Sequence, residues 1–397
     1  MSTTKIQRRY DLDWLRVLAI LMVFFYHSTR FFNLWDWHVK NSTTYLSVQV
    51  LETFMEVWMM PLIFVISGAS LFYAMNKGGI IRFLKDKFLR LLLPLLVVVF
   101  THASLQVYLE RLTHGQFRGT YFQFLPHYFD GMYLEIGSSG NFAWAGMHMW
   151  YVVVLFLFSL LFYPLLRWLK SGGKRILEVS GSLLAFPGAM FLLALPLIVL
   201  ESVTSDTGWG DFGAGGWPFV LYIPFFLAGF VIISSSRLQD TILRIRWFSL
   251  LLGLLVATAY LFLVFNADRL NIVALKEEID DPLVSLAAWC FLLAFLGFGR
   301  QYLNTTTPLL KYANEAVLPF YILHQTVLLV IGYFVVQWQI PALLKWLIIV
   351  PTSFTIIMLL YEFLVRRSNL LRVLFGMKTL RRIAPATTPV LARPVSE

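Results

Sequence analysis

Ten apolar segments, 17 to 29 residues long, restrict what this chain can fold into more than any other feature. A hydrocarbon layer about 30 Å thick needs roughly twenty helical residues to cross it, and a helix satisfies every backbone polar group within the segment. The segments are 12–33, 46–74, 88–109, 148–169, 183–201, 217–235, 247–266, 283–299, 315–337 and 341–364. The pattern predicts an all-α, polytopic membrane protein with about ten transmembrane helices.

Lysine and arginine residues indicate how these helices are oriented. If both chain ends are cytoplasmic, 24 of the 32 basic residues fall in cytoplasmic segments and 7 in outer segments, and Arg16 lies within the first span. Basic residues accumulate on the cytoplasmic side of membrane proteins, so this asymmetry predicts that both termini are cytoplasmic. The first apolar run has no small-residue cleavage site behind it, which favours a retained helix over a removed signal peptide.

The same pattern divides the chain into three parts. We expect a cytoplasmic N-terminal segment at 1–11, a membrane domain at 12–365 and a basic cytoplasmic tail at 366–397. The end of the tail is rich in proline and threonine and cannot bury enough apolar surface to fold alone, so we expect it to be partly disordered. Between the spans, we expect a long aromatic outer loop at 110–147 and a charged outer loop at 267–282.

Composition excludes several other classes of protein. The net charge of +10 arises from short basic clusters between apolar spans, which is typical of membrane topology and not of nucleic-acid binding. Cys290 is the only cysteine, so the chain has no intrachain disulfide and no cysteine-based metal cluster, and we predict no metal site.

The first span, "DWLRVLAILMVFFYH" at 13–27, contains charged and titratable residues that are costly to bury. Arg16 and His27 are eleven positions apart, which on a helix is about three turns and about 16 Å, so they share one face at different depths. Asp13 can pair with Arg16 across one turn. Arg16 could also be an interfacial cation reaching toward water, and His27 a histidine satisfied by a neighbouring helix. The functional interpretation of His27 is a general base for a hydroxyl group, because neutral imidazole titrates near physiological pH.

Further polar or aromatic residues in the spans are candidates for orienting the reacting groups or for binding an acceptor. Glu52 and Glu56 share a face of the second span. His148 is the first residue of the span at 148–169, and His324 lies within the span at 315–337. The full set of these candidates is Asp13, Glu52, Glu56, His148, Trp150, Tyr321 and His324.

Five blocks in order resemble the integral-membrane acyltransferase-3 family. They are residues 13–27, "MPLIFVISGASLFY" at 60–73, "KDKFLRLLLP" at 85–94, "HMWYVVVLFLF" at 148–158 and "LPFYILHQ" at 318–325. The resemblance implies transfer of an acyl group from cytoplasmic acyl-CoA to a hydroxyl of a carbohydrate or similar acceptor at the outer face. It also implies that His27 is catalytic and that Arg16 supports acyl-CoA binding or the site.

The chain departs from the family pattern at two places. Lys87 and Arg90 stand where the family has a pair of arginines, and lysine keeps the charge but loses the bidentate fork on phosphate. Residues 149–156 read "MWYVVVLF" and no additional esterase-like domain follows, which resembles the glucan-modifying, succinyl-transferring branch. The resemblance thus implies acetyl-CoA or succinyl-CoA as donor substrate, no permanently bound cofactor, and a bacterial inner-membrane location. It leaves open the acyl group, the acceptor, a covalent acyl-histidine and the oligomeric state, including a homodimer.

Two other functions remain compatible with the residues. A proton-coupled transporter or permease would use buried arginine, glutamate and histidine as a relay, and it predicts matched, Gly/Pro-broken helices in two repeats, which the sequence does not show clearly. A membrane sensor or scaffold predicts that Arg16 and His27 tolerate replacement.

Overall fold

The structure confirms an all-α membrane protein. It is a computed structural model that describes residues 8–75, 79–130, 143, 146–205 and 213–380. Within these residues, seven helices are long and apolar enough to cross a membrane, and two bent helix pairs raise the number to nine. The only strands in this part of the chain are two residues each, β1 (Gly213–Ala214) and β2 (Trp217–Pro218).

The helical elements follow one another along the chain with short connections. They are α1 (Tyr10–Thr29), α2 (Leu46–Ala74), α3 (Ile80–Lys87), η1 (Phe88–Leu92), α4 (Leu93–Phe100), α5 (His102–Thr113), α6 (Tyr121–Asp130), η3 (Met147–Met149), α7 (Trp150–Leu161), α8 (Tyr163–Lys170), α9 (Lys174–Leu183), α10 (Pro187–Leu192), α11 (Leu195–Ser205), η5 (Phe219–Leu221), α12 (Tyr222–Ser234), α13 (Ser236–Leu270), α14 (Val273–Tyr302), α15 (Pro308–Val335), α16 (Ala342–Leu360), η6 (Tyr361–Val365) and α17 (Asn369–Leu374).

Each of the ten predicted spans overlaps one or more of these helices. The third span corresponds to the pair 80–100 and 102–113, bent by 41°, and the fourth to the pair 147–161 and 163–170, bent by 53°. The sixth, at 219–234, is apolar but shorter than the seven long helices. The hairpin around Pro341 is present, because α15 ends at Val335 and α16 begins at Ala342.

The predicted charged loop at 267–282 is wrong. Helix α13 continues to Leu270, and α14 starts at Val273, so only Asn271 and Ile272 connect them. Asn271 adopts a left-handed conformation that ends α13 (φ 56°), a role that asparagine fills readily. The charges that suggested a loop instead lie on the first turns of α14, where Lys276 and Asp280 form an ion pair of 2.9 Å across one turn.

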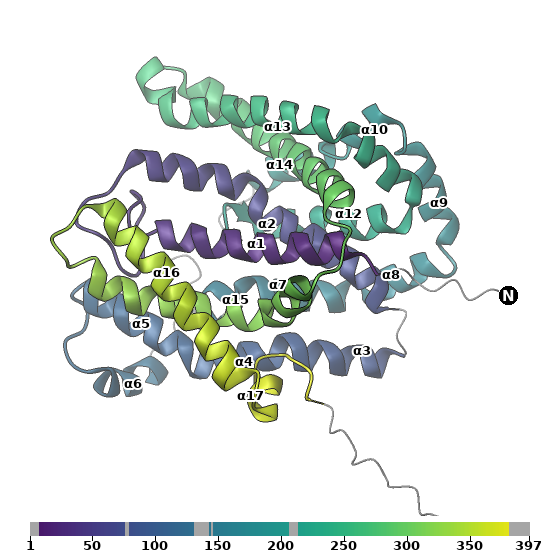
Figure 1. Cartoon of the computed structure of the whole chain (residues 1–397). Helices are drawn as coiled ribbons and strands as arrows, with labels where there is room; N and C mark the ends of the chain where they lie inside the picture. Colours follow the sequence, from purple (N-terminus) through teal and green to yellow (C-terminus); the bar gives the residue numbers. More distant parts are fainter. Residues whose placement is uncertain (1–7, 76–78, 131–142, 144–145, 206–212, 381–397) are drawn as a thin grey trace, which may run out of the picture.

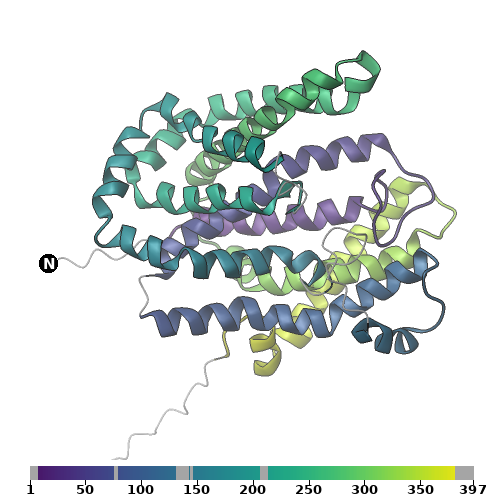
Figure 2. The ribbon, with the colours of Figure 1, turned by 180° about the vertical axis from the view of Figure 1, so that it is seen from behind.

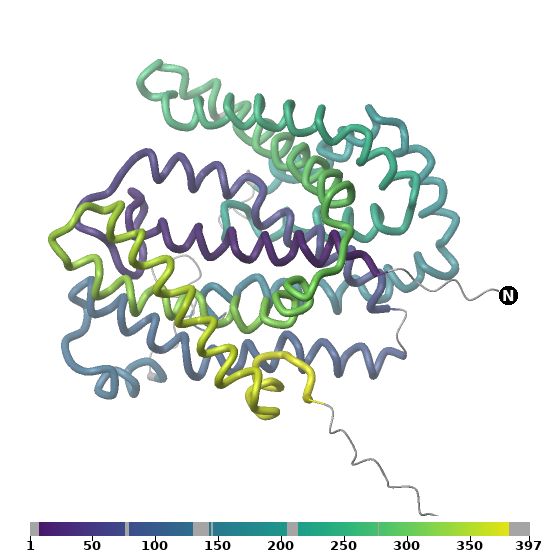
Figure 3. The backbone as a smooth tube through the Cα atoms, in the orientation of Figure 1, coloured from purple at the N-terminus to yellow at the C-terminus, as the bar shows by residue number. Residues whose placement is uncertain are grey.

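Helix α1 lies in the middle of the molecule and packs against α2, α14, α15 and α16 (Figure 1). The connections α1–α2, α5–α6 and α15–α16 gather at the end of the molecule opposite the amino terminus, as the backbone trace shows (Figure 3). Seen from behind, α3 to α5 form a long layer along one side of the bundle (Figure 2). The face of α1 that carries Arg16 and His27 is therefore enclosed by other helices.

Close backbone contact fixes α2 against α12. A Cβ atom added to Gly68 would lie 1.8 Å from the carbonyl oxygen of Phe226, and one added to Gly229 would lie 1.9 Å from that of Val65. Small residues allow membrane helices to approach this closely and to gain van der Waals contact. This contact anchors α2, which lines both cavities described below.

Candidate active site

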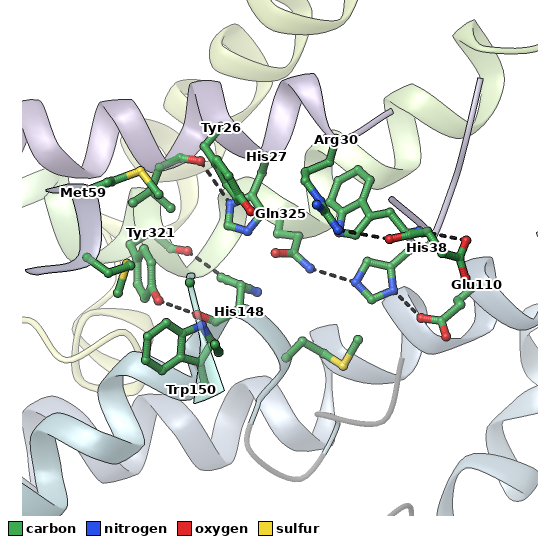
Figure 4. Close-up of a pocket in the computed structure, with 17 residues that line it drawn as sticks. Tyr26, His27, Arg30, His38, Met59, Glu110, His148, Trp150, Tyr321 and Gln325 are labelled. Carbon is green, nitrogen blue, oxygen red and sulfur yellow. Dashed lines mark hydrogen bonds and ion pairs between the residues drawn. The ribbon is translucent and has the colours of Figure 1, made fainter. Parts of the chain in front are cut away.

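Two cavities open within the bundle, one beyond the other along α1. The histidine pocket, about 300 Å³, is lined by His27, Trp37, His38, His148, Trp150 and Gln325 among others (Figure 4). The basic cavity, about 1080 Å³, is lined by residues near both described chain ends, such as Arg8 and Lys378. Tyr321 lines both cavities, so a single side chain belongs to both walls.

His27 lies on the pocket wall with one ring nitrogen already engaged. Its Nδ1 is 3.0 Å from the carbonyl oxygen of Val23 and 3.1 Å from Nε2 of His324. The imidazole is half-buried and is stacked near Trp37 at 6.2 Å between ring centroids. Nδ1 is thus held by its neighbours, and Nε2 is left for a ligand.

The neighbouring carbonyls determine which nitrogens carry protons. A carbonyl oxygen only accepts hydrogen bonds, so Nδ1 of His324, 2.6 Å from the carbonyl of Tyr321, is the donor. In neutral His324, Nε2 is then an acceptor for Nδ1–H of His27, and the carbonyl of Val23 accepts the same hydrogen. His27 consequently has its lone pair on Nε2, as a general base requires.

Tyr321 organises this part of α15. Its carbonyl also accepts from Nε2 of His148 (3.0 Å), and its hydroxyl donates to the carbonyl of His148. Its ring lies against that of His324, with centroids 5.4 Å apart and an angle of 29°. The histidines predicted separately at 27, 148 and 324 therefore form one cluster around Tyr321, and Trp150 lines the same pocket.

Glu52 and Glu56 do not line the pocket but hold residues that do. Glu56 accepts a hydrogen bond from the hydroxyl of Tyr26 (2.5 Å). Glu52, fully buried, lies 3.6 Å from the guanidinium of Arg30 and accepts from Thr29 (2.7 Å). Tyr26 and Arg30 are pocket residues, so the two carboxylates lie behind the wall as orienting groups.

Other pocket residues were not identified from the sequence. His38 pairs through Nδ1 with Glu110 of α5, and Gln325 of α15 contacts the other nitrogen of His38 at 3.1 Å. These residues come from three separate parts of the chain, so no spacing within one segment relates them. The position of Gln325 directly after His324 is the only signal that could have drawn attention to it.

The segment that contains His38 has a second attachment at the end of α5, an ion pair at the molecular surface. Asp36 lies 3.1 Å from Nε2 of His114. Partial burial lowers the pKa of His114, but the hydrogen bond and charge of Asp36 and the carbonyl of Glu110 outweigh it, so the pKa is raised. Burial raises the pKa of Asp36, and the same histidine outweighs that effect and lowers it. Thr113 completes the attachment by donating to the carbonyl of His38 (2.6 Å).

In the basic cavity, Arg16 is positioned by polar neighbours from three helices. Its guanidinium lies 3.2 Å from the side-chain oxygen of Asn314, 3.1 Å from Ser70 Oγ and 3.6 Å from Asp13. The sequence prediction that Asp13 pairs with Arg16 is borne out by this distance. Arg16 lines the cavity, with a third of its side chain exposed.

Lys87 and Arg90 line the same cavity from α3 and η1. Arg90 pairs with Asp86 at 2.9 Å, and the short π-helix at 88–92 sets the direction of its side chain. Such π-helical turns are frequent at functional sites. The cavity wall has eight cationic side chains against the three carboxylates of Asp13, Asp86 and Glu315. The cations are Arg8, Arg9, Arg16, Lys87, Arg90, Lys311, Arg372 and Lys378.

Part of the predicted tail contributes to this wall. Arg372 of α17 donates to Glu315 (2.7 Å) and to the carbonyls of Lys378 (2.6 Å) and Arg366 (3.1 Å). Gly376, with φ of 70°, approaches the carbonyl of Arg90 so closely that an added Cβ would lie 2.9 Å from it. The end of the tail, from 381 on, lies outside the described residues.

No group of three or more histidine, cysteine or carboxylate side chains in the described part of the chain is arranged to hold a metal ion. Cys290 is buried.

Comparison with known proteins gives a consistent result. The chain matches the acyltransferase-3 family model, described as an acyltransferase domain, over residues 9–362. It is 22% identical over 391 residues to "Glucans biosynthesis protein C" of Salmonella paratyphi B and of Salmonella enteritidis, covering 95% of this chain and 97% of each relative. No solved structure matches the chain.

Proposed function

The chain belongs to the acyltransferase-3 family and is a multi-pass membrane acyltransferase, and from this premise we propose that it transfers an acyl group from cytoplasmic acyl-CoA to a hydroxyl at the outer face. The observation that carries the proposal is the shared wall at Tyr321. It brings a pocket with an available imidazole lone pair next to a large cavity rich in cations. A donor bound in one cavity could thus present its acyl group to the other.

The basic cavity suits the donor. Coenzyme A is polyanionic at its nucleotide end, and Arg16, Lys87 and Arg90 line the cavity as partners for phosphate. Its thin pantetheine arm would extend along α1, over the roughly 16 Å that separate Arg16 from His27. The thioester would then meet His27 while the anionic end stays on the cytoplasmic side.

The reaction follows from the protonation state of the histidine cluster. Nε2 of His27 takes the proton of the acceptor hydroxyl as its oxygen attacks the thioester carbonyl. The new C–O bond forms, the C–S bond breaks, and His27 returns the proton to the departing thiolate. His324 and the carbonyl of Val23 hold Nδ1–H throughout and stabilise the transient imidazolium. An acyl-histidine intermediate would use the same Nε2 as nucleophile.

The relatives suggest the acceptor and the setting. The name of these relatives refers to glucan biosynthesis, which supports a carbohydrate acceptor. We further propose an acetyl or succinyl donor group and a bacterial inner-membrane location. The lipid bilayer surrounds the protein, and no role for nucleic acid follows from the cavities. A homodimer remains compatible with the apolar, exposed helices.

The test is CoA release by purified protein in nanodiscs, with acetyl-CoA or succinyl-CoA as donor and glucose disaccharides as acceptors. His27→Ala should reduce transfer by at least about 10²-fold, the range for loss of a positioned base. His102→Ala is the matched control, since His102 lines neither cavity. Equal CoA release by wild type and His27→Ala would refute the role of His27. A wild type that releases no CoA but moves protons or solutes across proteoliposomes would support the transporter alternative.

A further inference from the structure

Two hydrogen-bonding atoms of residues that line the histidine pocket have no partner within the described part of the chain. They are Oε1 of Gln325 and Nδ1 of His148, in side chains that are 3% and 5% exposed. A buried polar group without a partner costs free energy, and such groups in native proteins call for an explanation. The carbohydrate proposed above as acyl acceptor offers an explanation, because its hydroxyls can donate hydrogen bonds to these atoms.

The amide orientation of Gln325 is determined by a chain of hydrogen bonds. Glu110 accepts from Nδ1–H of His38, so in neutral His38 the other nitrogen is an acceptor. The amide nitrogen of Gln325 donates one hydrogen to that nitrogen (3.1 Å) and the other to Oε1 of Gln106 (3.1 Å). The amide nitrogen of Gln106 in turn donates to the hydroxyl of Thr326 (2.7 Å).

A reversed amide would place the oxygen of Gln325 against two acceptors at once. The observed orientation therefore uses both N–H groups and leaves Oε1 as an acceptor alone. In Figure 4 the amide nitrogen points to His38, and the oxygen lies on the other side of the amide group.

His148 also has a ring nitrogen that can only accept a hydrogen bond. Its Nε2 donates to the carbonyl of Tyr321 (3.0 Å), so in the neutral form its Nδ1 has the lone pair. His148 is buried against the ring of His324, with centroids 4.8 Å apart, and burial disfavours a charged imidazole. Both unpartnered atoms are thus acceptors that need a donor from a ligand.

We propose that Gln325 and His148 form a hydroxyl-binding subsite beside His27, with Gln325 held in place by His38, Glu110 and Gln106. The subsite takes two hydroxyls of a neutral sugar, next to the hydroxyl that His27 deprotonates. Fully ionised phosphate and carboxylate groups do not fit, because they have no hydrogen to donate to the two acceptors. Trp37, on the same wall, offers a flat face for the sugar ring. This inference rests on the proposed function and assigns its acceptor specificity.

The experiment measures sugar binding without turnover. Saturation-transfer NMR is recorded on full-length protein in nanodiscs with sophorose, laminaribiose, cellobiose and gentiobiose, without acyl-CoA. Gln325→Leu keeps the side-chain volume and removes the acceptor. We expect Gln325→Leu to weaken binding of the preferred disaccharide about five- to tenfold, as for loss of one hydrogen bond.

Ser249→Ala is the control for loss of a buried, unpartnered polar atom elsewhere, because Ser249 of α13 lines neither cavity. It should bind like wild type. The proposal is overturned if no disaccharide binds wild type, or if Gln325→Leu and wild type bind equally. Failure of the proposed function is a separate result, namely sugar binding by wild type without any CoA release.

Discussion

The histidine pocket and the basic cavity meet at Tyr321, yet they are built on different principles. The basic cavity is more than three times larger, about 1080 Å³ against about 300 Å³, and its wall includes eight arginine and lysine side chains. In the histidine pocket, neutral imidazoles and an amide are held by backbone carbonyls and by one another. Long-range attraction needs charge but little precision, whereas proton transfer needs fixed geometry. The comparison predicts that substitutions in the pocket change kcat and those in the cavity change the KM for acyl-CoA.

His324→Ala should give the largest effect among variants that keep His27. Loss of the contact to Nδ1 frees the ring of His27, and small misplacements of a catalytic group can cost about 10²-fold in rate. We expect kcat to fall by about that factor while the KM for acyl-CoA stays constant, as measured by CoA release. A rise in this KM with unchanged kcat would contradict the division between the two cavities.

Removing single cationic side chains from the basic cavity should affect only the binding of acyl-CoA. Lys87→Ala and Arg90→Ala should each raise the KM for acyl-CoA about tenfold, the value for one charge-assisted hydrogen bond to phosphate, and the effect should shrink at high salt. Lys174→Ala is the matched control, because this exposed lysine pairs with Glu178 outside the cavity. If the control raises the KM equally, the positive charge acts over the whole surface and not within the cavity.

Tyr321→Phe tests the boundary between the two regions. The change removes the buried hydrogen bond to the carbonyl of His148 but keeps the ring and the carbonyl that orients both histidines. We expect a loss of about 1 kcal/mol in the free energy of unfolding, seen as a lower Tm, with the KM for acyl-CoA unchanged. A raised KM for acyl-CoA with an unchanged Tm would mean that the hydroxyl itself contacts the donor.

The smallest effect should come from pH at the segment that carries Trp37 and His38. His114 has a raised pKa, so its contribution to stability is complete below its unfolded pKa and is lost as pH rises through the folded pKa. Asp36 has a lowered pKa, so its contribution is present above its unfolded pKa and is lost as pH falls through the folded one. The pair should therefore stabilise residues 30–45 between about pH 4 and 7, by at most about 1 kcal/mol.

Hydrogen exchange of this segment as a function of pH measures that stabilisation. Wild type should show most protection within the window, and His114→Gln should lose the dependence at its upper edge. Identical profiles for the two proteins would show that His38 and Thr113 attach the segment without help from the ion pair.

The sequence predicted helix positions better than the connections between helices. Apolar length alone located the spans, because crossing a hydrocarbon layer requires it. The charges at 267–282 were misinterpreted as a loop, since the same residues at a four-residue spacing stabilise the start of α14. A charged segment outside the hydrocarbon can be helical or irregular, and its charge does not distinguish the two.

The sequence by itself determined that Arg16 and His27 share one face of a helix about 16 Å apart, because helix geometry fixes the relation of residues within one element. Only the tertiary structure decided which groups surround them. His324 and Gln325 come from α15, His38 from the α1–α2 connection and Glu110 from α5. Contacts between distant elements depend on how whole helices pack, and a pattern within one segment does not contain that information. The acceptor subsite is therefore a property of the fold.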